Sequence, residues 1–208
     1  MLRFLRARAL RDHPLLASSM FCDRAAQFRD RLGWAVAVND AGEERDAYDA
    51  LELNALYVMW EGREGRHAGS LRFLPTLGPT MLADYFAGLT DGVTFRSPYI
   101  WECTRFCVAP DAPAHVAAAL MLGALEVGLA HGLSHAIGVF DARMVRVYNR
   151  LGWPPAILGT QGTGHDAISA GLWSFEAALL PALAARAGLT SADLADWRAD
   201  AGLSDTYA

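Results

Sequence analysis

The sequence contains no lysine, and all 18 of its basic residues are arginine. We attribute this to the base composition of the gene, because average proteins use both residues freely. Acidic residues outnumber basic ones by 23 to 18, which gives a net charge of −5. Binding along a nucleic-acid backbone needs a basic face, so we expect no nucleic-acid partner.

Cysteine and long apolar runs are also scarce. The three cysteines form no CxxC pair, which argues against a disulfide framework or a zinc knuckle and fits a reducing cytoplasm. No run reaches the roughly 18 apolar residues of a membrane span, and the arginine-rich start does not resemble a signal peptide. His131 and His135 lack the glutamate of a zinc-protease motif, so we expect no metal site.

With 208 residues the chain is long enough for one domain with a substantial core. Hydrophobic periodicity predicts strands at 56–60, 70–74, 99–108 and 135–140, and helices at 14–32, around 81–89, and at 114–131, 142–151, 173–187 and from Ser191. The first two strands should form a hairpin. The other two flank a helix, which favours a parallel pair with a right-handed crossover. The predicted fold class is α/β, a mixed sheet with helices on both faces.

Several charged residues lie within apolar segments. Arg72 stands between Leu71 and Phe73, while Glu102 and Arg105 lie three apart in YIWECTRFCV. Residues three apart in a regular strand point to opposite faces, so a shared pocket would require a β-bulge. The alternative for each is a charge that faces solvent.

Four sequence blocks carry most of these residues. They are FCDRAAQFRDRLGW with Arg24, Phe28 and Trp34, RDAYD with Asp46 and Asp49, SLRFLPT with Arg72, and YIWECTRFCV with Glu102 and Arg105. In this order, over residues 20–110, they resemble the acyl-homoserine-lactone synthase family of bacterial quorum sensing. The resemblance implies a single GNAT-like domain, with residues 1–36 as an amino-terminal cap over the S-adenosylmethionine pocket and residues 37–208 as the core.

The resemblance also implies a reaction in two steps. The amine of S-adenosylmethionine attacks the thioester of an acyl-carrier protein or acyl-coenzyme A. Its carboxylate then displaces methylthioadenosine and closes the lactone. Both molecules are substrates, so no permanently bound cofactor is expected.

Two sets of residues are assigned to this chemistry. An α-amino group has a pKa of about 7.7 to 8.0 and needs a base before it attacks, a role given to Glu102. The catalytic set is Glu102, Arg105, Asp46 and Asp49, and the S-adenosylmethionine-binding set is Arg24, Phe28, Trp34 and Arg72. Carboxylates would hold the amine, and the two aromatic rings would face the sulfonium. Arg24 and Arg105 would bind carboxylates, either those of the ligand or those of the acidic cluster, and Arg72 would pair with an acid in the same network. Ordinary core packing is the alternative for the aromatic residues.

The acyl chain and its carrier are assigned to the second half of the chain. The expected pocket residues are Met121, Leu125, Gly138, Val139, Met144 and Val147. Family members that prefer 3-oxo chains often have threonine near the position of Gly138, so an unsubstituted chain is expected. Arg143, Arg146 and Arg150 share one helix face and would dock the anionic carrier protein or coenzyme A, with a solvated surface as the alternative.

Two other functions remain open at this point. An ordinary GNAT N-acyltransferase using acyl-coenzyme A would carry Arg/Gln-x-x-Gly-x-Gly/Ala before the long helix, and the segment VAPDAPAHVAAAL does not match it. A non-catalytic binder of acyl chains or lactones would need neither Glu102 nor the acidic cluster.

Overall fold

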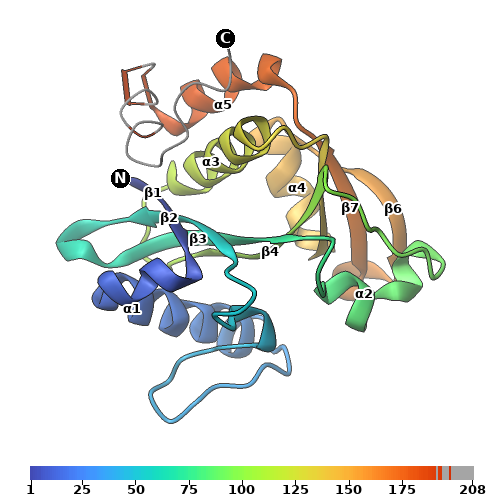
Figure 1. Cartoon of the computed structure of the whole chain (residues 1–208), viewed down its shortest axis with the longest axis horizontal. Coiled ribbons are helices and arrows are strands. Elements are labelled where there is room, and N and C mark those ends of the chain that lie inside the picture. The colour runs from blue at the N-terminus through green and yellow to red at the C-terminus, as the bar shows by residue number, and fades with distance from the viewer. Residues whose placement is uncertain (191, 194–196, 198–208) are drawn as a thin grey trace.

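The computed structural model of the protein describes residues 1–190, 192, 193 and 197. Seven strands form one sheet in the order β1-β2-β3-β4-β5-β7-β6, with helices on both faces (Figure 1). The strands are β1 Leu2–Arg6, β2 Leu56–Glu61, β3 His67–Pro75, β4 Ile100–Val108, β5 His135–Asp141, β6 Ala156–Gln161 and β7 Ile168–Ser174. The helices are α1 Pro14–Ala25, α2 Met81–Tyr85, α3 Val116–Ala130, α4 Ala142–Leu151 and α5 Leu180–Ala187. The expected mixed α/β domain is confirmed.

Strand pairing confirms the predicted hairpin and the predicted parallel pair. β2 and β3 form an antiparallel hairpin, and β4 and β5 pair in parallel on either side of α3 in the sequence. The parallel ladder is short, because it joins Ile100–Glu102 to His135–Ile137. Past Glu102 these two described strands are no longer paired, so the sheet opens there.

The carboxy-terminal strands differ from the expectation. The helix predicted over 173–187 is wrong in its first half, because β7 occupies Ile168–Ser174 and α5 begins at Leu180. Two further strands, β1 and β6, occupy segments where no strand is expected. The interior of β7 is mostly buried and β6 is mostly exposed, so neither shows the alternation that marks a half-buried strand. Most of the helix expected from Ser191 lies outside the described residues.

The strands β2 and β3 alternate their side chains between two hydrophobic cores. Val58 and Phe73 belong to the larger core, formed with α3, whereas Met59 belongs to the smaller core, formed with α1. In Figure 1, α1 and α3 lie on opposite sides of these strands. A period of two therefore places Arg72 on the α1 side, next to Phe73 in sequence but on the other face.

The helix α3 is buried on nearly every side. It packs against β2, β3 and α5, and its sequence is apolar except for Glu126. Its 15 residues are fewer than a membrane span requires. In the described part of the chain, no helix is long and apolar enough to cross a membrane.

A β-bulge interrupts the pairing of β3 with β4. The register on either side of it is Ser70 with Cys107 and Arg72 with Thr104. Arg105 and Phe106 therefore both stand opposite Leu71. Arg105 has φ +55°, the left-handed conformation that glycine usually supplies at the first position of such a bulge.

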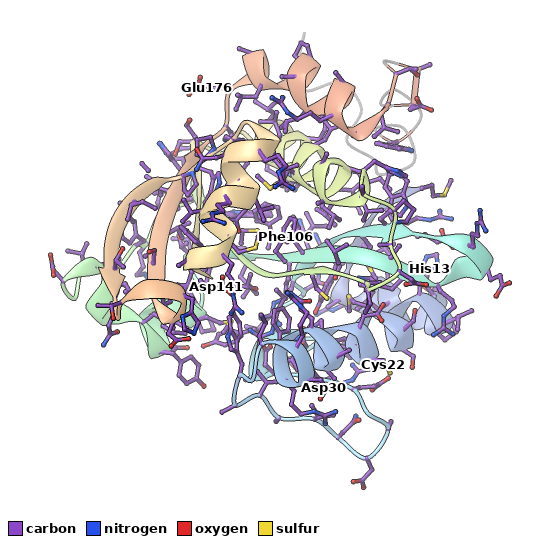
Figure 2. The ribbon with its side chains drawn as sticks, turned by 180° about the vertical axis from the view of Figure 1, so that it is seen from behind. His13, Cys22, Asp30, Phe106, Asp141 and Glu176 are labelled. Carbon is purple, nitrogen blue, oxygen red and sulfur yellow. The ribbon has the colours of Figure 1, made fainter. Side chains whose placement is uncertain are left out.

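The bulge moves Arg105 to the same face of β4 as Glu102. Before the bulge the odd-numbered Trp101 packs in the α3 core, and after the bulge the even-numbered Phe106 packs there. The residues that face the α3 core therefore change from odd to even numbers at the bulge. Phe106 lies between the sheet and α4 (Figure 2). The bulge required for a shared pocket is thus present.

Candidate active site

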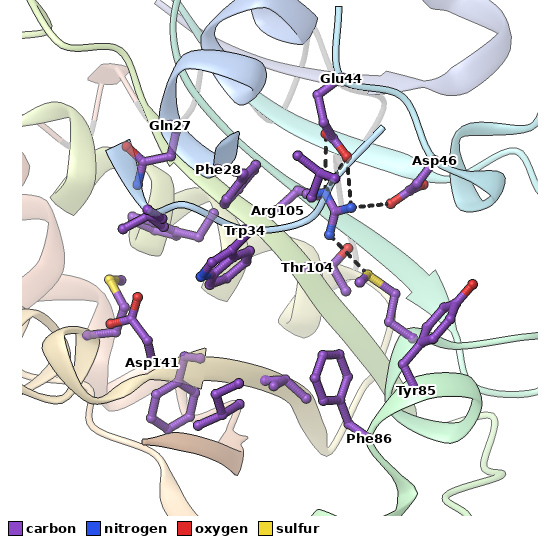
Figure 3. A pocket seen from close by; sticks show the side chains of 18 of the residues that line it. Gln27, Phe28, Trp34, Glu44, Asp46, Tyr85, Phe86, Thr104, Arg105 and Asp141 are labelled. Carbon is purple, nitrogen blue, oxygen red and sulfur yellow. Dashed lines mark hydrogen bonds and ion pairs between the residues drawn. The ribbon is translucent and has the colours of Figure 1, made fainter. Parts of the chain in front are cut away.

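A cavity of about 820 Å³ lies between the amino-terminal segment, the sheet and α4 (Figure 3). Its walls come from the chain around residues 27–37, the acidic segment at 44–48, α2, β4, β5 and α4. Five residues of the expected catalytic and S-adenosylmethionine-binding sets line it, namely Phe28, Trp34, Asp46, Glu102 and Arg105. Arg24, Asp49 and Arg72 are not among the residues that line it.

The aromatic wall depends on an irregular helix end. The helix α1 continues into a π-helical segment, Ala26–Arg31, and Gly33 then reverses the chain at φ +70°. The backbone N–H of Trp34 donates to the Phe28 carbonyl at 2.8 Å. The two rings stack with centroids 5.2 Å apart and an interplanar angle of 17°. The cavity therefore has a paired aromatic wall rather than two separate rings.

The acidic segment RDAYD folds into a short 3₁₀ turn that positions both of its aspartates. The Asp46 carboxylate accepts the backbone N–H of Tyr48, and the Asp49 carboxylate accepts that of Asp46, each at 2.9 Å. This reciprocal capping box fixes the two side chains locally. The Tyr57 hydroxyl donates a further hydrogen bond of 2.6 Å to Asp49.

Behind this turn, two buried arginines bind the same aspartate. Arg24 donates through both Nη atoms to Asp49 at 3.0 Å, and Arg72 donates through Nη1 to Asp49 at 2.6 Å. Their side chains are 1% and 0% exposed. Burial opposes ionisation of Asp49, but the two guanidinium groups outweigh it and hold the pKa of this carboxyl below its ordinary value. Asp49 is thus fully occupied by protein partners.

The third arginine of the network, Arg105, reaches the cavity. Its Nη2 atom lies 2.8 Å from both Glu44 Oε1 and Asp46 Oδ2 (Figure 3). Arg24 also binds Glu44, and Arg72 also binds Asp46. Three guanidinium groups therefore neutralise three carboxylates.

Glu44 is a central residue that sequence reasoning missed. It is 1% exposed, lines the cavity and bridges Arg24 and Arg105. The signal was its place in GEERD, two residues before Asp46. An acidic run beside turn-forming residues is also typical of a solvated loop, so the sequence did not single it out.

Glu102 has a different environment. Its carboxylate is fully buried and accepts backbone N–H groups from Met81 at 2.9 Å and Leu82 at 2.6 Å. Burial raises the pKa of Glu102 to about 7, although these two hydrogen bonds act in the opposite direction. The group can therefore exchange a proton near neutral pH.

Four carboxylates line the cavity, those of Glu44, Asp46, Glu102 and Asp141. Three of them form ion pairs with arginine. Glu102 forms no ion pair with any described residue; its bonds are to backbone N–H groups. It is thus the carboxylate best placed to interact with a cationic ligand.

The expected acyl-pocket residues fall into three groups. Val139, Met144 and Val147 line the large cavity. Met121, Gly138 and again Val139 line a second cavity of about 50 Å³ beside the opening between β4 and β5. Leu125 lines neither cavity, because it is fully buried in the α3 core.

The basic stripe on α4 is present but uneven. Arg143 lines the large cavity and binds Asp141, with Nη2 to Oδ2 at 3.1 Å. Asp141 also caps α4 by accepting the backbone N–H of Arg143. Arg146 and Arg150 are exposed and form no ion pair with a described residue.

The weaker candidates have ordinary structural places. His131 bonds through Nδ1 to the Val127 carbonyl at the end of α3. All three cysteines are free, and Cys107 is buried. Among the described residues, no group of three histidine, cysteine, aspartate or glutamate side chains is arranged to hold a metal ion.

A family model described as autoinducer synthase matches residues 8–177. The chain belongs to this family. It is 40% identical over 183 residues to an acyl-homoserine-lactone synthase of Rhizobium etli, with 85% of each chain covered. The protein is therefore an acyl-homoserine-lactone synthase, an acyltransferase.

Solved structures agree with this assignment. The synthase matches BjaI, a coenzyme A-dependent acyl-homoserine-lactone synthase that was solved with S-adenosylmethionine and isopentyl-coenzyme A. The TM-score is 0.78 and the sequence identity is 25%, and the match covers 92% of this chain and 90% of BjaI. A putative N-acetyltransferase from Lactobacillus plantarum matches at a TM-score of 0.54 and 13% identity, covering 84% of this chain and 99% of the other. The second match shows the GNAT-like fold.

Proposed function

We propose that the large cavity of the synthase binds S-adenosylmethionine and that Glu102 deprotonates its amine. The observation that carries this is that Glu102 lacks an ion-pair partner among the described residues and has its pKa raised to about 7. A base with a pKa near the working pH is suited to an amine with a pKa of about 7.7 to 8.0. BjaI, solved with S-adenosylmethionine, has the same overall fold.

The aromatic wall binds the sulfonium end of this substrate. The stacked rings of Phe28 and Trp34 line the cavity, and the face of an aromatic ring attracts a cation. Attraction between a cation and such a face contributes about 0.5 to 2 kcal/mol. Within the amino-terminal cap, residues 1–36, the part that would contact the substrate is therefore its end, in the segment 27–37. The strand β1 of that cap belongs to the sheet.

The arginine and carboxylate network holds the polar end. Asp46 and Glu44 face the cavity and would attract the ammonium group, while Arg105 would attract the substrate carboxylate. Arg24, Arg72 and Asp49 lie behind them, so we assign them to positioning rather than to contact with substrate. This revises the expected direct roles of those three residues.

The thioester enters from the side of α4. In the first step Glu102 takes one proton from the ammonium group, and the neutral nitrogen forms a bond to the thioester carbon. The carbon–sulfur bond breaks, and the leaving thiolate receives the second proton that the nitrogen loses, so that an amide and a free thiol result. Thr104 accepts a hydrogen bond from Arg72 Nε at 3.1 Å, which leaves the threonine hydroxyl proton for the thioester carbonyl. The acyl chain then lies along Val139, Met144 and Val147.

In the second step the substrate carboxylate attacks the carbon bound to the sulfonium. The carbon–sulfur bond breaks, methylthioadenosine leaves with the electron pair, and the lactone closes. No protein group needs to gain or lose a proton in this step. Arg105 would orient the carboxylate for attack.

The donor is an acyl-carrier protein or acyl-coenzyme A, and both are anionic. Arg146 and Arg150 on the exposed face of α4 would dock either one. S-adenosylmethionine and the thioester act as substrates, without a resident cofactor. The three free cysteines fit a cytoplasmic enzyme.

The proposal is tested by mass spectrometry of purified synthase with S-adenosylmethionine and a panel of acyl thioesters. Lactone and methylthioadenosine should appear in equal amounts and at a rate that Glu102→Gln lowers. An acylated S-adenosylmethionine without lactone would instead support an ordinary N-acyltransferase. Binding of lactone with no turnover would support a non-catalytic binder. The comparisons favour the synthase over both.

A further inference from the structure

The large cavity and the small cavity share part of their walls. Five residues line both cavities, namely Thr104, Arg105, Phe106, Val139 and Tyr148. Two sheet strands and α4 therefore meet at the junction. On the proposed function, an acyl chain that starts at the thioester near Glu102 passes this junction within its first few carbons.

Most polar side-chain groups of the small cavity are already bonded. The indole N–H of Trp153 donates to the Ser174 carbonyl at 3.0 Å, and that of Trp173 donates to the Trp153 carbonyl at 3.1 Å. Arg105 is held in ion pairs, and the Thr104 oxygen accepts from Arg72, while the proton of its hydroxyl is the one assigned above to the thioester carbonyl. The two indoles thus present carbon surface to the small cavity.

Tyr148 is the exception among the hydroxyl and indole groups of the small cavity. It is 6% exposed, yet its hydroxyl makes no hydrogen bond to any described residue. Every fully enclosed side-chain nitrogen or oxygen in the described part of the chain has a partner. The hydroxyl must therefore touch open space, and the open space that Tyr148 lines is the two cavities.

The ring of Tyr148 is firmly held. It makes edge contacts with Phe140, Trp173 and Phe106, at centroid distances of 5.3, 5.0 and 6.4 Å. Burial raises the pKa of Tyr148, so the phenol stays neutral and keeps its proton. A rigid, neutral hydroxyl at this place is a prepared hydrogen-bond donor.

The strand opposite offers no such group. Gly138 lines the same small cavity, and a Cβ atom there would lie 2.7 Å from the carbonyl oxygen of Cys103. Any larger residue at position 138 would push β4 and β5 apart. A hydroxyl at the junction can therefore come from α4 but not from this point of β5.

We propose that the Tyr148 hydroxyl donates a hydrogen bond to an oxygen on carbon 3 of the acyl chain, so that the synthase selects 3-oxo or 3-hydroxy acyl thioesters. An unsubstituted chain would place methylene groups against a buried hydroxyl and leave that hydroxyl without a hydrogen bond, which weakens binding of the chain. The inference rests on the proposed function, because it requires the acyl chain to pass the junction. It replaces the expectation of an unsubstituted chain drawn from Gly138.

The test compares kcat/KM for octanoyl-, 3-oxooctanoyl- and 3-hydroxyoctanoyl-coenzyme A in wild type and Tyr148→Phe. Wild type should prefer at least one substituted donor by about tenfold, the scale set by about 1.4 kcal/mol. Tyr148→Phe, which removes one oxygen, should abolish that preference by slowing transfer of the substituted chains, while octanoyl transfer is not slowed, because the variant has no hydroxyl to leave unpaired. Tyr99→Phe on the surface is the matched control and should leave the ratios unchanged.

The remaining outcomes are distinct. Wild type that favours octanoyl-coenzyme A would overturn the inference, even where Tyr148→Phe cannot be purified. An equal loss with all three donors would also overturn it and would place the hydroxyl at the thioester or the leaving thiol. Lactone formation with none of the donors, on coenzyme A or on acyl-carrier protein, would overturn the proposed function instead.

Discussion

The carboxylate of Glu102 on β4 accepts a hydrogen bond of 2.6 Å from the backbone N–H of Leu82 in the first turn of α2. Its other oxygen accepts the neighbouring N–H of Met81. Each carboxylate oxygen has a second acceptor site, so these bonds fix the side chain without using up its capacity as a base. The orientation of the base is thus set by backbone atoms, independently of the arginine network.

Glu102→Gln should lower kcat about tenfold or more, because the amide cannot take the proton of the amine. The amide NH₂ also cannot accept a hydrogen bond, so one of the two N–H groups loses its partner, at a cost of about 1 to 3 kcal/mol. Steady-state kinetics and urea unfolding measure the two effects separately. Wild-type kcat in a folded variant would remove Glu102 from the mechanism.

The raised pKa of Glu102 predicts a pH dependence of both rate and stability. For wild type, kcat/KM should rise as pH increases through about 7, the pKa of Glu102. In Glu102→Gln this rise should be absent, and the pH profile should show only the ionisation of the substrate amine. Because folding raises the pKa, the protonated form favours the folded state. The free energy of unfolding should therefore fall as pH rises from the ordinary value of 4.5 to about 7, and this fall should be absent in Glu102→Gln. Identical pH profiles for the two proteins would contradict the assignment.

Asp49→Asn tests the buried network. The change leaves Arg24 and Arg72 with a neutral partner, and breaking a buried ion pair costs about 3 to 5 kcal/mol. Asp49 has a lowered pKa, so its contribution is present near neutral pH and is lost as pH falls. Urea unfolding at pH 7 measures the loss. Asp30→Asn, in the exposed pair with Arg29, is the control and should unfold as wild type does.

Much of the site could be predicted because its residues break local rules. Arg72, Glu102 and Arg105 stood out as charges in apolar strands, and their spacing predicted the bulge that Arg105 forms. What could not be predicted depends on contacts between distant segments. Glu44 looks like a loop residue until Arg24 and Arg105 approach it. The strands β6 and β7 were missed because β6 is mostly exposed and β7 is mostly buried. Neither strand therefore shows the alternation of apolar and polar residues by which a strand is recognised in a sequence.

Trp34→Ala should weaken S-adenosylmethionine more than the acyl thioester. Trp34 belongs to the aromatic wall with Phe28 and does not line the small cavity. The apparent KM for S-adenosylmethionine should rise about tenfold, as expected for the loss of a cation–π contact. Trp34→Phe keeps a π-face and should recover most of the affinity. Equal increases in both KM values would show that the residue only supports the fold.

The final prediction concerns the exposed part of the α4 stripe. Arg143 is bound to Asp141, so Arg146 and Arg150 are the residues of the stripe available to an anionic acyl carrier. Charges at the edge of a binding interface act mainly on the rate at which the two partners meet, and salt screens them. Replacing both residues by glutamate should therefore raise the KM for the thioester about tenfold at low salt, with a smaller difference at high salt. The KM for S-adenosylmethionine should not change.

Net charge is the competing explanation, and a second double variant separates it from docking. Arg63→Glu with Arg66→Glu makes the same change in charge on the exposed turn between β2 and β3, whose residues do not line either cavity. Docking on α4 predicts that this control keeps the wild-type KM and salt dependence. If both double variants raise the KM equally, the overall charge of the protein governs the encounter. If neither does, Arg146 and Arg150 are solvated surface, and the carrier binds elsewhere on the synthase.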